Sequence, residues 1–269
     1  MKSINLERKQ HNARIGDRLP IMAHNVSEDC LLYDQGELIG FYIHDLRQYS
    51  EKLTNLMEVA NAEFRSDNVP KQLLERSDVF QAVYKEGKSR AEAKATQTIQ
   101  YSTIIGSIPP KPHMRRPYPS RSSVHRDKKA QTFIKAMLLA ALESEKLIAE
   151  FMPEHYAKQK AELSKVPEEW RFGNLFTSSI SNYNISAPYH QDNGNIRPSV
   201  NAIITKRQNS TGGSLAVPDY DAVFEQADNS LLVYPAWRNV HGVTPIVQTH
   251  DGGYRNSLVF YGLRAFQEA

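Results

Sequence analysis

The chain has 269 residues, 40% of them hydrophobic and 23% charged, and a formal net charge of +3 at pH 7. These values fit one large or two small globular domains with a sizeable core, and the charge alone is too small to indicate a nucleic-acid partner. The only cysteine, Cys30, excludes an intramolecular disulfide and any multi-cysteine zinc or iron–sulfur site, so a bound metal would need nitrogen and oxygen ligands.

The N-terminus and the apolar runs bear on location. The first residues, MKSINLERKQHN, lack the apolar region of a signal peptide, and the longest strongly apolar run, AMLLAAL, is too short to cross a bilayer. We therefore predict a cytoplasmic protein with no membrane and no disulfide partner. The sequence does not indicate the oligomeric state.

Residues 1–110 are predicted to form a helical elaboration packed on the rest of the molecule. A short strand is expected at the start of LIGFYIHDL, and apolar residues at helical spacing then predict a helix in HDLRQYSEKLTNLMEVANAEF, with Asp45 at its start. SDVFQAVYKEGKSRAEAKATQT is a second expected helix, and QYSTIIGSIPP is a strand-like run that two prolines end.

Residues 111–129 form a basic segment with seven arginines and lysines against one acid, Asp127. Its prolines prevent a helix, so we expect an ordered or partly ordered loop. The amphipathic pattern that follows over residues 130–163 predicts a long helix, kinked or broken at Pro153.

Residues 172–264 change to short β-rich runs separated by turns such as DNGN, NSTGG and HDGG. About seven such runs are typical of a sandwich or jelly roll. We therefore predict an α+β fold in which residues 111–269 hold the basic segment, the long helix and a jelly-roll core. The N-terminal helices are expected to cover one face of that core.

Two histidines and an aspartate in the β-rich half form a candidate metal site. In APYHQDNGN, His190 and Asp192 stand two residues apart at the expected end of a strand, so both side chains point to one face. His241 opens a later strand. Two imidazoles and a carboxylate on one face of a metal, with the other positions open, form the facial triad of non-heme Fe(II) oxygenases. We predict that these three residues bind a metal.

An arginine and a serine complete the candidate site. Arg255 and Ser257 share one face of a later strand, and a co-substrate with a dicarboxylate tail would need such a cation and hydrogen-bond donor at its far end. His250 and Arg264 repeat the spacing of His241 and Arg255. His250 lies in the turn HDGG, however, and no serine stands two residues after Arg264, so His241 is favoured.

A second His-x-Asp pair, His125 and Asp127, lies in the basic segment, where no strand aligns the two side chains. We interpret it as polar surface sequence. Each candidate residue has its own structural alternative, such as a surface pair beside a turn or a hydrogen-bonded histidine at a strand end. The joint order of the set in the β-rich half favours a metal site.

With YHQDNG, NVHGVTPI and YRNSLVFYG in this order, residues 172–264 resemble the 2-oxoglutarate/Fe(II)-dependent dioxygenases, whose fold is a double-stranded β-helix. The run GGSLAVPDYDAVFEQADNSLLVYPAWRNVHGV is similar to the TET/JBP branch, which oxidises the 5-methyl group of pyrimidine bases in nucleic acid. IIGSIPPKPHMRRPYPSRSS resembles the substrate-side segment before the core of such enzymes. The chain lacks the cysteine-rich zinc region of the animal members and resembles a compact microbial or viral one.

The resemblance implies Fe(II), 2-oxoglutarate as co-substrate, and O₂. The catalytic metal ligands would be His190, Asp192 and His241, and Arg255 with Ser257 would hold the distal carboxylate of 2-oxoglutarate. If the strand before His190 is regular, further side chains on its face would touch the co-substrate, and these are Asn182 and Asn184.

The resemblance also implies DNA as the substrate, with hydroxylation of the 5-methyl group of 5-methylcytosine or thymine. A base within a duplex must be flipped out to reach the metal. Three arginines of the basic segment would contact the DNA unless that segment is merely solvated, and these are Arg115, Arg116 and Arg121. Aromatic side chains that could stack on the base are Tyr118, Tyr220 and Trp237.

Two alternative functions stay open. The same metal site would serve a 2-oxoglutarate dioxygenase that acts on an amino acid, a peptide or an N-alkylated base. A non-catalytic jelly-roll binding module is the other alternative, and the complete set of ligands with its arginine argues against it.

Overall fold

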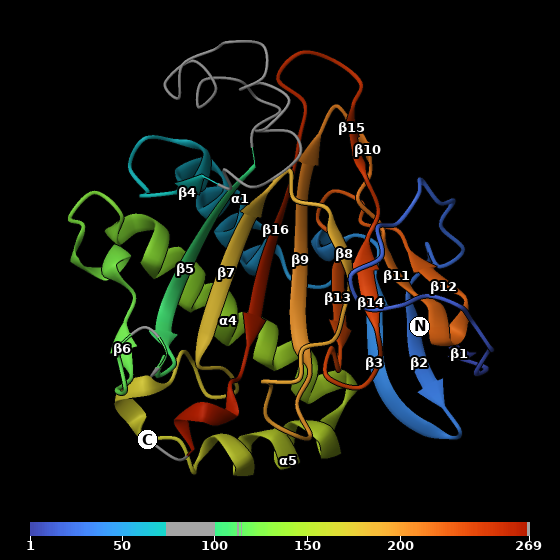
Figure 1. Ribbon diagram of the computed structural model, residues 1–269, viewed down its shortest axis with the longest axis horizontal. Helices are drawn as coiled ribbons and strands as arrows, with labels where there is room; N and C mark the ends of the chain where they lie inside the picture. Colours follow the sequence, from blue (N-terminus) through green and yellow to red (C-terminus); the bar gives the residue numbers. More distant parts are fainter. Residues whose placement is uncertain (74–99, 112, 114, 268–269) are drawn as a thin grey trace.

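The computed structural model describes residues 1–73, 100–111, 113 and 115–267. The fold is α+β, with helices covering one face of a large sheet and a smaller sheet packed against part of the other face (Figure 1). The second helix expected from the sequence, in residues 77–98, lies outside the described residues.

The large sheet has ten strands. Neighbouring strands in it are antiparallel, except that the first two are parallel. In order across the sheet they are β1 (Lys2–Asn5), β2 (Cys30–Asp34), β3 (Glu37–Ile43), β13 (Leu231–Tyr234), β9 (Asn201–Gln208), β16 (Tyr254–Tyr261), β7 (Ser178–Tyr183), β5 (Tyr101–Ile108) and β4 (Gln72–Leu73), with β6 (Ser120–Arg121) paired to β5.

Two smaller sheets and a set of helices complete the fold. The four-stranded sheet contains, in order, β12 (Ala222–Phe224), β11 (Leu215–Val217), β14 (His241–Val243) and β8 (Ala187–His190), and the two-stranded sheet contains β10 (Ser210–Gly212) and β15 (Ile246–Gln248). The α-helices are α1 (Glu51–Arg65), α4 (Gln131–Phe151) and α5 (Pro153–Leu163). The 3₁₀ turns are η1 (Leu46–Gln48), η3 (Ser123–Arg126), η4 (Glu168–Trp170), η5 (Pro218–Tyr220) and η6 (Arg264–Phe266).

The central strands β9 and β16 are buried on both faces over most of their length, which explains the uninterrupted apolar runs AII and LVF within them. Ile204 and Leu258 are paired across the two strands and point into the core beneath α1 and α4. Ile203 and Val259, one residue on, point to the opposite face. Because side chains alternate along a strand, the same two strands serve the helical core and the space between the sheets.

Among the α-helices, α1 begins at a side-chain cap, which differs from the expected one. Ser50 caps α1 by accepting the N–H of Leu53, whereas Asp45, the expected start, caps the preceding turn η1. The predicted long helix is broken as expected, since α4 ends at Phe151 and α5 begins with Pro153 at its first position. Proline suits the first position of a helix because an N–H there would have no acceptor within the helix.

The N-terminal region differs from the predicted helical elaboration. β1, β2 and β3 extend the large sheet beyond β13, and β5 extends it on the other side beyond β7. The sheet is therefore not confined to residues 172–264. A short apolar run such as ELIGFYI in β3 does not reveal its partner from sequence, because its pairing with β13 joins residues that are about 190 positions apart.

The four-stranded sheet packs on only part of the large sheet. Its apolar side chains share a core with β2, β3 and β13, around Phe224, Tyr42 and Tyr234. Over β9, β16 and β7 the two sheets face each other across a pocket. Cys30 lies in this core as a free thiol, and burial raises its pKa to about 11. Among the helices described, none combines the length and apolarity that a bilayer crossing requires.

Candidate metal centre

His190, Asp192 and His241 come together at the pocket. His190 ends β8 and His241 begins β14, and these two residues are direct partners in the pairing of the strands. Their ring centroids lie 4.3 Å apart, and His190 Nε2 lies 3.9 Å from Asp192 Oδ1. One potential ligand atom from each residue lies within 4.8 Å of the others. Small side-chain rotations would let the three share one ion.

Both histidines have their Nδ1 atoms tied to backbone carbonyls. His190 Nδ1 lies 2.8 Å from the carbonyl of Pro188, and His241 Nδ1 lies 3.1 Å from that of Asn239. A carbonyl only accepts, so Nδ1 carries the proton and the lone pair of a neutral ring sits on Nε2. Burial, and then the nearby His190, lower the pKa of His241 and favour the neutral ring that binds metals.

Two asparagines orient the carboxylate of Asp192. Asn201 donates its amide to Asp192 Oδ2 at 3.2 Å, and Asn195 donates to Asn201 Oδ1 at 2.9 Å. Both asparagines are buried. This arrangement leaves Asp192 Oδ1 facing His190. Sequence reasoning missed both residues, although a polar Asn201 at the start of the apolar strand NAII was a possible signal.

The pocket has a volume of about 620 Å³ and joins this cluster to β16. Alternate residues of β16 line it, as the period of two predicts for Arg255 and Ser257. Tyr261, further along, also lines it, and burial together with the nearby Asp192 raises the pKa of its hydroxyl. Apolar side chains that form the walls are Ile180, Ile203, Leu215, Val243 and Val259.

Arg255 is a buried cation without a counter-ion. It is 2% exposed, and among the described residues no carboxylate lies within ion-pair distance of it. Its Nη2 donates to the neutral Gln226 Oε1 at 3.3 Å, and its Nε has no partner. Burial, and then Arg207 opposite it on β9, lower the pKa of Arg255. An unpaired buried charge is costly, so this end of the pocket favours an anion.

Of the two asparagines predicted to touch the co-substrate, only Asn182 lines the pocket. Asn182 is the strand partner of Ser257. Asn184 adopts a left-handed backbone, with φ of 54°, and its Oδ1 accepts the N–H of Arg255 at 2.8 Å, so it shapes the backbone instead. The condition of a regular strand up to His190 is not met, because β7 ends at Tyr183 and β8 belongs to the other sheet.

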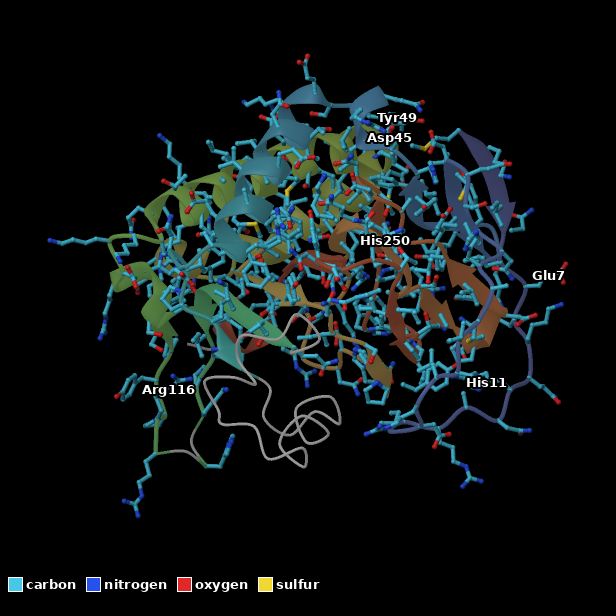
Figure 2. All side chains as sticks on the ribbon, turned by 90° about the horizontal axis from the view of Figure 1, so that it is seen from above. Glu7, His11, Asp45, Tyr49, Arg116 and His250 are labelled. Atoms are coloured by element: carbon cyan, nitrogen blue, oxygen red, sulfur yellow. The ribbon has the colours of Figure 1, made fainter. Side chains whose placement is uncertain are left out.

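The rival histidines lie away from the cluster. His250 is exposed on a bend (Figure 2), and Arg264 is exposed in η6. The prediction that His125 is polar surface sequence is wrong, because its half-buried ring accepts the N–H of Gly106 at 2.8 Å. It fastens the basic segment to β5 rather than pairing with Asp127.

The three predicted arginines of the basic segment do not line the pocket. Arg115 and Arg121 are exposed, whereas Arg116 is half-buried and reaches the carbonyl of Pro109 at 3.4 Å. Backbone hydrogen bonds pair Lys111 with Arg116 as an isolated antiparallel bridge, at a place where the basic segment projects from the body (Figure 2). Within the described part of the segment, no arginine or lysine forms an ion pair.

The candidate stacking residues divide as well. Tyr118 is 60% exposed on the basic segment. Tyr220 is buried and donates its hydroxyl to Asp34, so it belongs to the core. Trp237 is half-buried, donates to the carbonyl of Ser199 and lies beneath the guanidinium of Arg197, 5.1 Å from the ring centroid. Only Tyr118 presents an open ring.

Comparison with known proteins gives one family and several similar folds. A family model described as Tet_JBP, the oxygenase domain of the 2OGFeDO superfamily, matches residues 111–264. The solved structure of NgTET1 in complex with 5mC DNA has 14% identity and a TM-score of 0.60, covering 95% of this chain and 84% of that one.

Two further structures match less well. An oxidoreductase of the 2OG-Fe(II) oxygenase family from Burkholderia pseudomallei has 14% identity, a TM-score of 0.44 and 77% coverage of each chain. A bsmA homolog from Methylobium petroleophilum PM1 has 11% identity and a TM-score of 0.42, covering 94% of this chain and 97% of that one. A search of curated proteins gives no match.

Proposed function

The chain belongs to the Tet_JBP family, the oxygenase domain of the 2OGFeDO superfamily, and from this premise we propose that it hydroxylates the 5-methyl group of a pyrimidine base in DNA. It is a 2-oxoglutarate/Fe(II)-dependent dioxygenase that uses Fe(II), 2-oxoglutarate and O₂. We also propose that its two facing sheets are the two halves of a double-stranded β-helix, with strands of residues 172–264 at the centre.

His190, Asp192 and His241 are the proposed ligands of Fe(II). Two neutral imidazoles and one carboxylate suit this ion, and both Nε2 lone pairs are free because each Nδ1 is committed to a carbonyl. Bound Fe(II) would supply the activation of O₂. The protein's part is to hold the three donors on one face, with Asn201 fixing the second oxygen of Asp192.

Arg255 is the proposed partner of the distal carboxylate of 2-oxoglutarate, and this buried unpaired cation in the same pocket as the ligand cluster is the observation that carries the site assignment. A guanidinium can bind a carboxylate through two parallel hydrogen bonds. Ser257 and Asn182, strand partners on the pocket face, add polar contacts beside it. The overall reaction converts 2-oxoglutarate, O₂ and a substrate C–H into succinate, CO₂ and a C–OH group.

A DNA base is the proposed substrate on two grounds. The similar fold of NgTET1 was solved with 5mC DNA, and the basic segment carries exposed arginines that form no ion pair with any acidic side chain in the described part of the chain. Such residues suit phosphate contacts, whereas the apolar walls of the pocket suit a methyl group and exclude water. A duplex base would have to leave the stack to enter, so mismatched or single-stranded sites should react fastest.

Mass spectrometry of nucleosides tests this proposal. The purified protein with Fe(II), 2-oxoglutarate and O₂ should convert 5-methylcytosine or thymine in DNA to the 5-hydroxymethyl base, and His241→Ala should not. Substrates that contain only one of the two bases identify which is used. Succinate formation with unchanged nucleosides would overturn the DNA proposal and direct the search to amino acids, peptides or N-alkylated bases.

A further inference from the structure

Residues 6–25, which we call the N-terminal strap, cross the outer face of the four-stranded sheet as an irregular segment (Figure 1). Glu7 and His11 mark its course at the edge of the molecule opposite Arg116 (Figure 2). The strap is anchored at both ends, by Leu6 N–H to the carbonyl of Tyr33 and by Asn25 N–H to that of Val223.

The strap contacts both strands that carry the candidate histidine ligands, β8 and β14, on the side opposite the pocket. Gly16 N–H donates to the carbonyl of Tyr189, and Tyr189 N–H donates to that of Asp17, at 2.8 and 2.9 Å. Leu19 packs on Gly242, where a Cβ would come within 2.5 Å of the leucine side chain. The contacted residues, Tyr189 and Gly242, are the chain neighbours of His190 and His241.

A chain of polar contacts links the strap to His241. His11 Nε2 lies 2.5 Å from Asp219 Oδ1, and the other oxygen of Asp219 accepts the side-chain amide of Asn239. Asn239 is buried, and its Oδ1 accepts the hydroxyl of Tyr234 at 2.8 Å. The side chain of Asn239 is therefore held at both ends, which fixes the backbone carbonyl that binds His241 Nδ1.

We propose that Asp219 is a positioning residue for His241, and that His11 of the N-terminal strap secures it. This inference rests on the proposed role of His241 as a metal ligand. The hydrogen-bond partner of a ligand histidine sets which nitrogen is free and how the ring is turned. Asp219 acts on that partner by holding Asn239, so its loss should weaken metal binding without removing a ligand.

Metal affinity tests the proposal directly, with Mn(II) alone as the probe and free Mn(II) measured by electron paramagnetic resonance. Asp219→Asn should weaken binding about tenfold, at the low end of the range for residues behind a metal ligand. The matched control is Asp221→Asn, which removes the same charge at a position two residues further along the chain. Asp219, and not Asp221, accepts the side-chain amide of Asn239. It should leave the affinity unchanged.

A second variant guards against misfolding. His11→Ala changes an exposed strap residue and should also weaken Mn(II) binding, by a smaller factor than Asp219→Asn, while the metal-free Tm of both variants stays close to that of the parent. The line shape of bound Mn(II) should broaden or shift in Asp219→Asn, since a merely structural residue would not alter the ligand geometry. The KM for 2-oxoglutarate should change little, because Arg255 lies at the other end of the pocket.

The outcomes separate this inference from the proposed function. If His241→Ala abolishes Mn(II) binding while Asp219→Asn binds like Asp221→Asn, the positioning role is overturned and the ligand assignment stands. If His241→Ala itself binds Mn(II) normally, the ligand assignment fails and the inference fails with it.

Discussion

Among the described residues, the arginines without an ion-pair partner include some that are exposed on the basic segment and one that is buried in the pocket, and the two settings predict different kinds of ligand. Arg115 and Arg121 are exposed on the basic segment, where water and salt compensate the charge at little cost. Arg255 is buried between two sheets, and within the described ranges a neutral glutamine is the one side-chain acceptor it meets. A buried charge without a partner lowers the stability of the fold by several kcal/mol, and binding of an anionic ligand would offset that loss.

The comparison shows that burial, rather than the number of charges, makes an arginine specific. The pocket predicts one bound anion at Arg255 and one bound cation at the cluster of His190, Asp192 and His241. The basic segment predicts only attraction to polyanions. Changes in the pocket should therefore alter catalysis by large factors, and changes in the basic segment should alter affinity in a graded, salt-dependent way.

The largest expected effect comes from the ligand cluster. Alanine at His190, Asp192 or His241 should abolish the conversion of 2-oxoglutarate to succinate and leave a folded protein, because each removes a proposed ligand near the protein surface or pocket. The check is succinate formation together with the metal-free Tm. His250→Ala, the matched control on an exposed bend, should keep full activity. The reverse pattern would reassign the distal ligand.

Arg255 should come next. Losing a charge-assisted bidentate pair costs about 1.5–3 kcal/mol, so Arg255→Met should raise the KM for 2-oxoglutarate roughly 10- to 150-fold. The same variant should raise the Tm of the ligand-free protein, because it removes an unpaired buried charge. Arg255→Lys should recover only part of the affinity. An unchanged KM with a lowered Tm would make Arg255 a structural residue.

Gln226 tests whether the missing counter-ion matters. Gln226→Glu would give Arg255 a buried carboxylate partner in place of a neutral one and should raise the KM for 2-oxoglutarate roughly tenfold, since the ligand then competes with an internal ion pair. Gln226→Leu, which adds no charge, should raise it much less. Initial rates over a range of 2-oxoglutarate concentrations distinguish the two. Equal effects of both variants would mean that packing, not charge, explains them.

The basic segment should give a graded effect. Arg115→Ala with Arg121→Ala should flatten the slope of log K against log[salt] for duplex DNA by up to about 0.9 per lost phosphate contact, because fewer counter-ions are released. The control removes the same charge from exposed sites on the helices, by Lys135→Ala with Lys158→Ala. An identical slope in both double variants would show that the segment does not contact DNA.

The smallest expected effect is a pH dependence of the segment's attachment. Burial, and then Arg121, lower the pKa of His125, whose Nε2 must be unprotonated to accept the N–H of Gly106. A histidine whose pKa is lower in the folded state stabilises above its ordinary pKa of about 6.5, and that contribution is lost as the pH falls below it. The protection factor of the Gly106 N–H, which is the intrinsic exchange rate at each pH divided by the observed rate, should therefore fall on acidification. His125→Gln keeps an acceptor and should remove this dependence.

Local rules explain part of the candidate site. The spacing of Arg255 and Ser257 puts both on the pocket face of β16 because side chains alternate along a strand, whereas β8 ends at His190 and Asp192 lies beyond it, so the expected shared strand face does not explain why these two side chains are close. The break at Pro153 and the lack of an α-helix among the described residues of the basic segment follow equally from the chemistry of proline. These features depend on a few neighbouring residues, so the sequence shows them directly.

Tertiary structure decided which polar residues support that site. Asn201 meets Asp192, Gln226 meets Arg255 and Asp219 meets Asn239 at separations of 9, 29 and 20 residues, because loops between the strands fold back against the two facing sheets. The same holds for β1, β2 and β3, which join the large sheet through pairing with β13, and for the strap behind the ligand strands. Alternation along a strand is local, whereas the partner across a sheet or pocket is set by the packing of the whole chain.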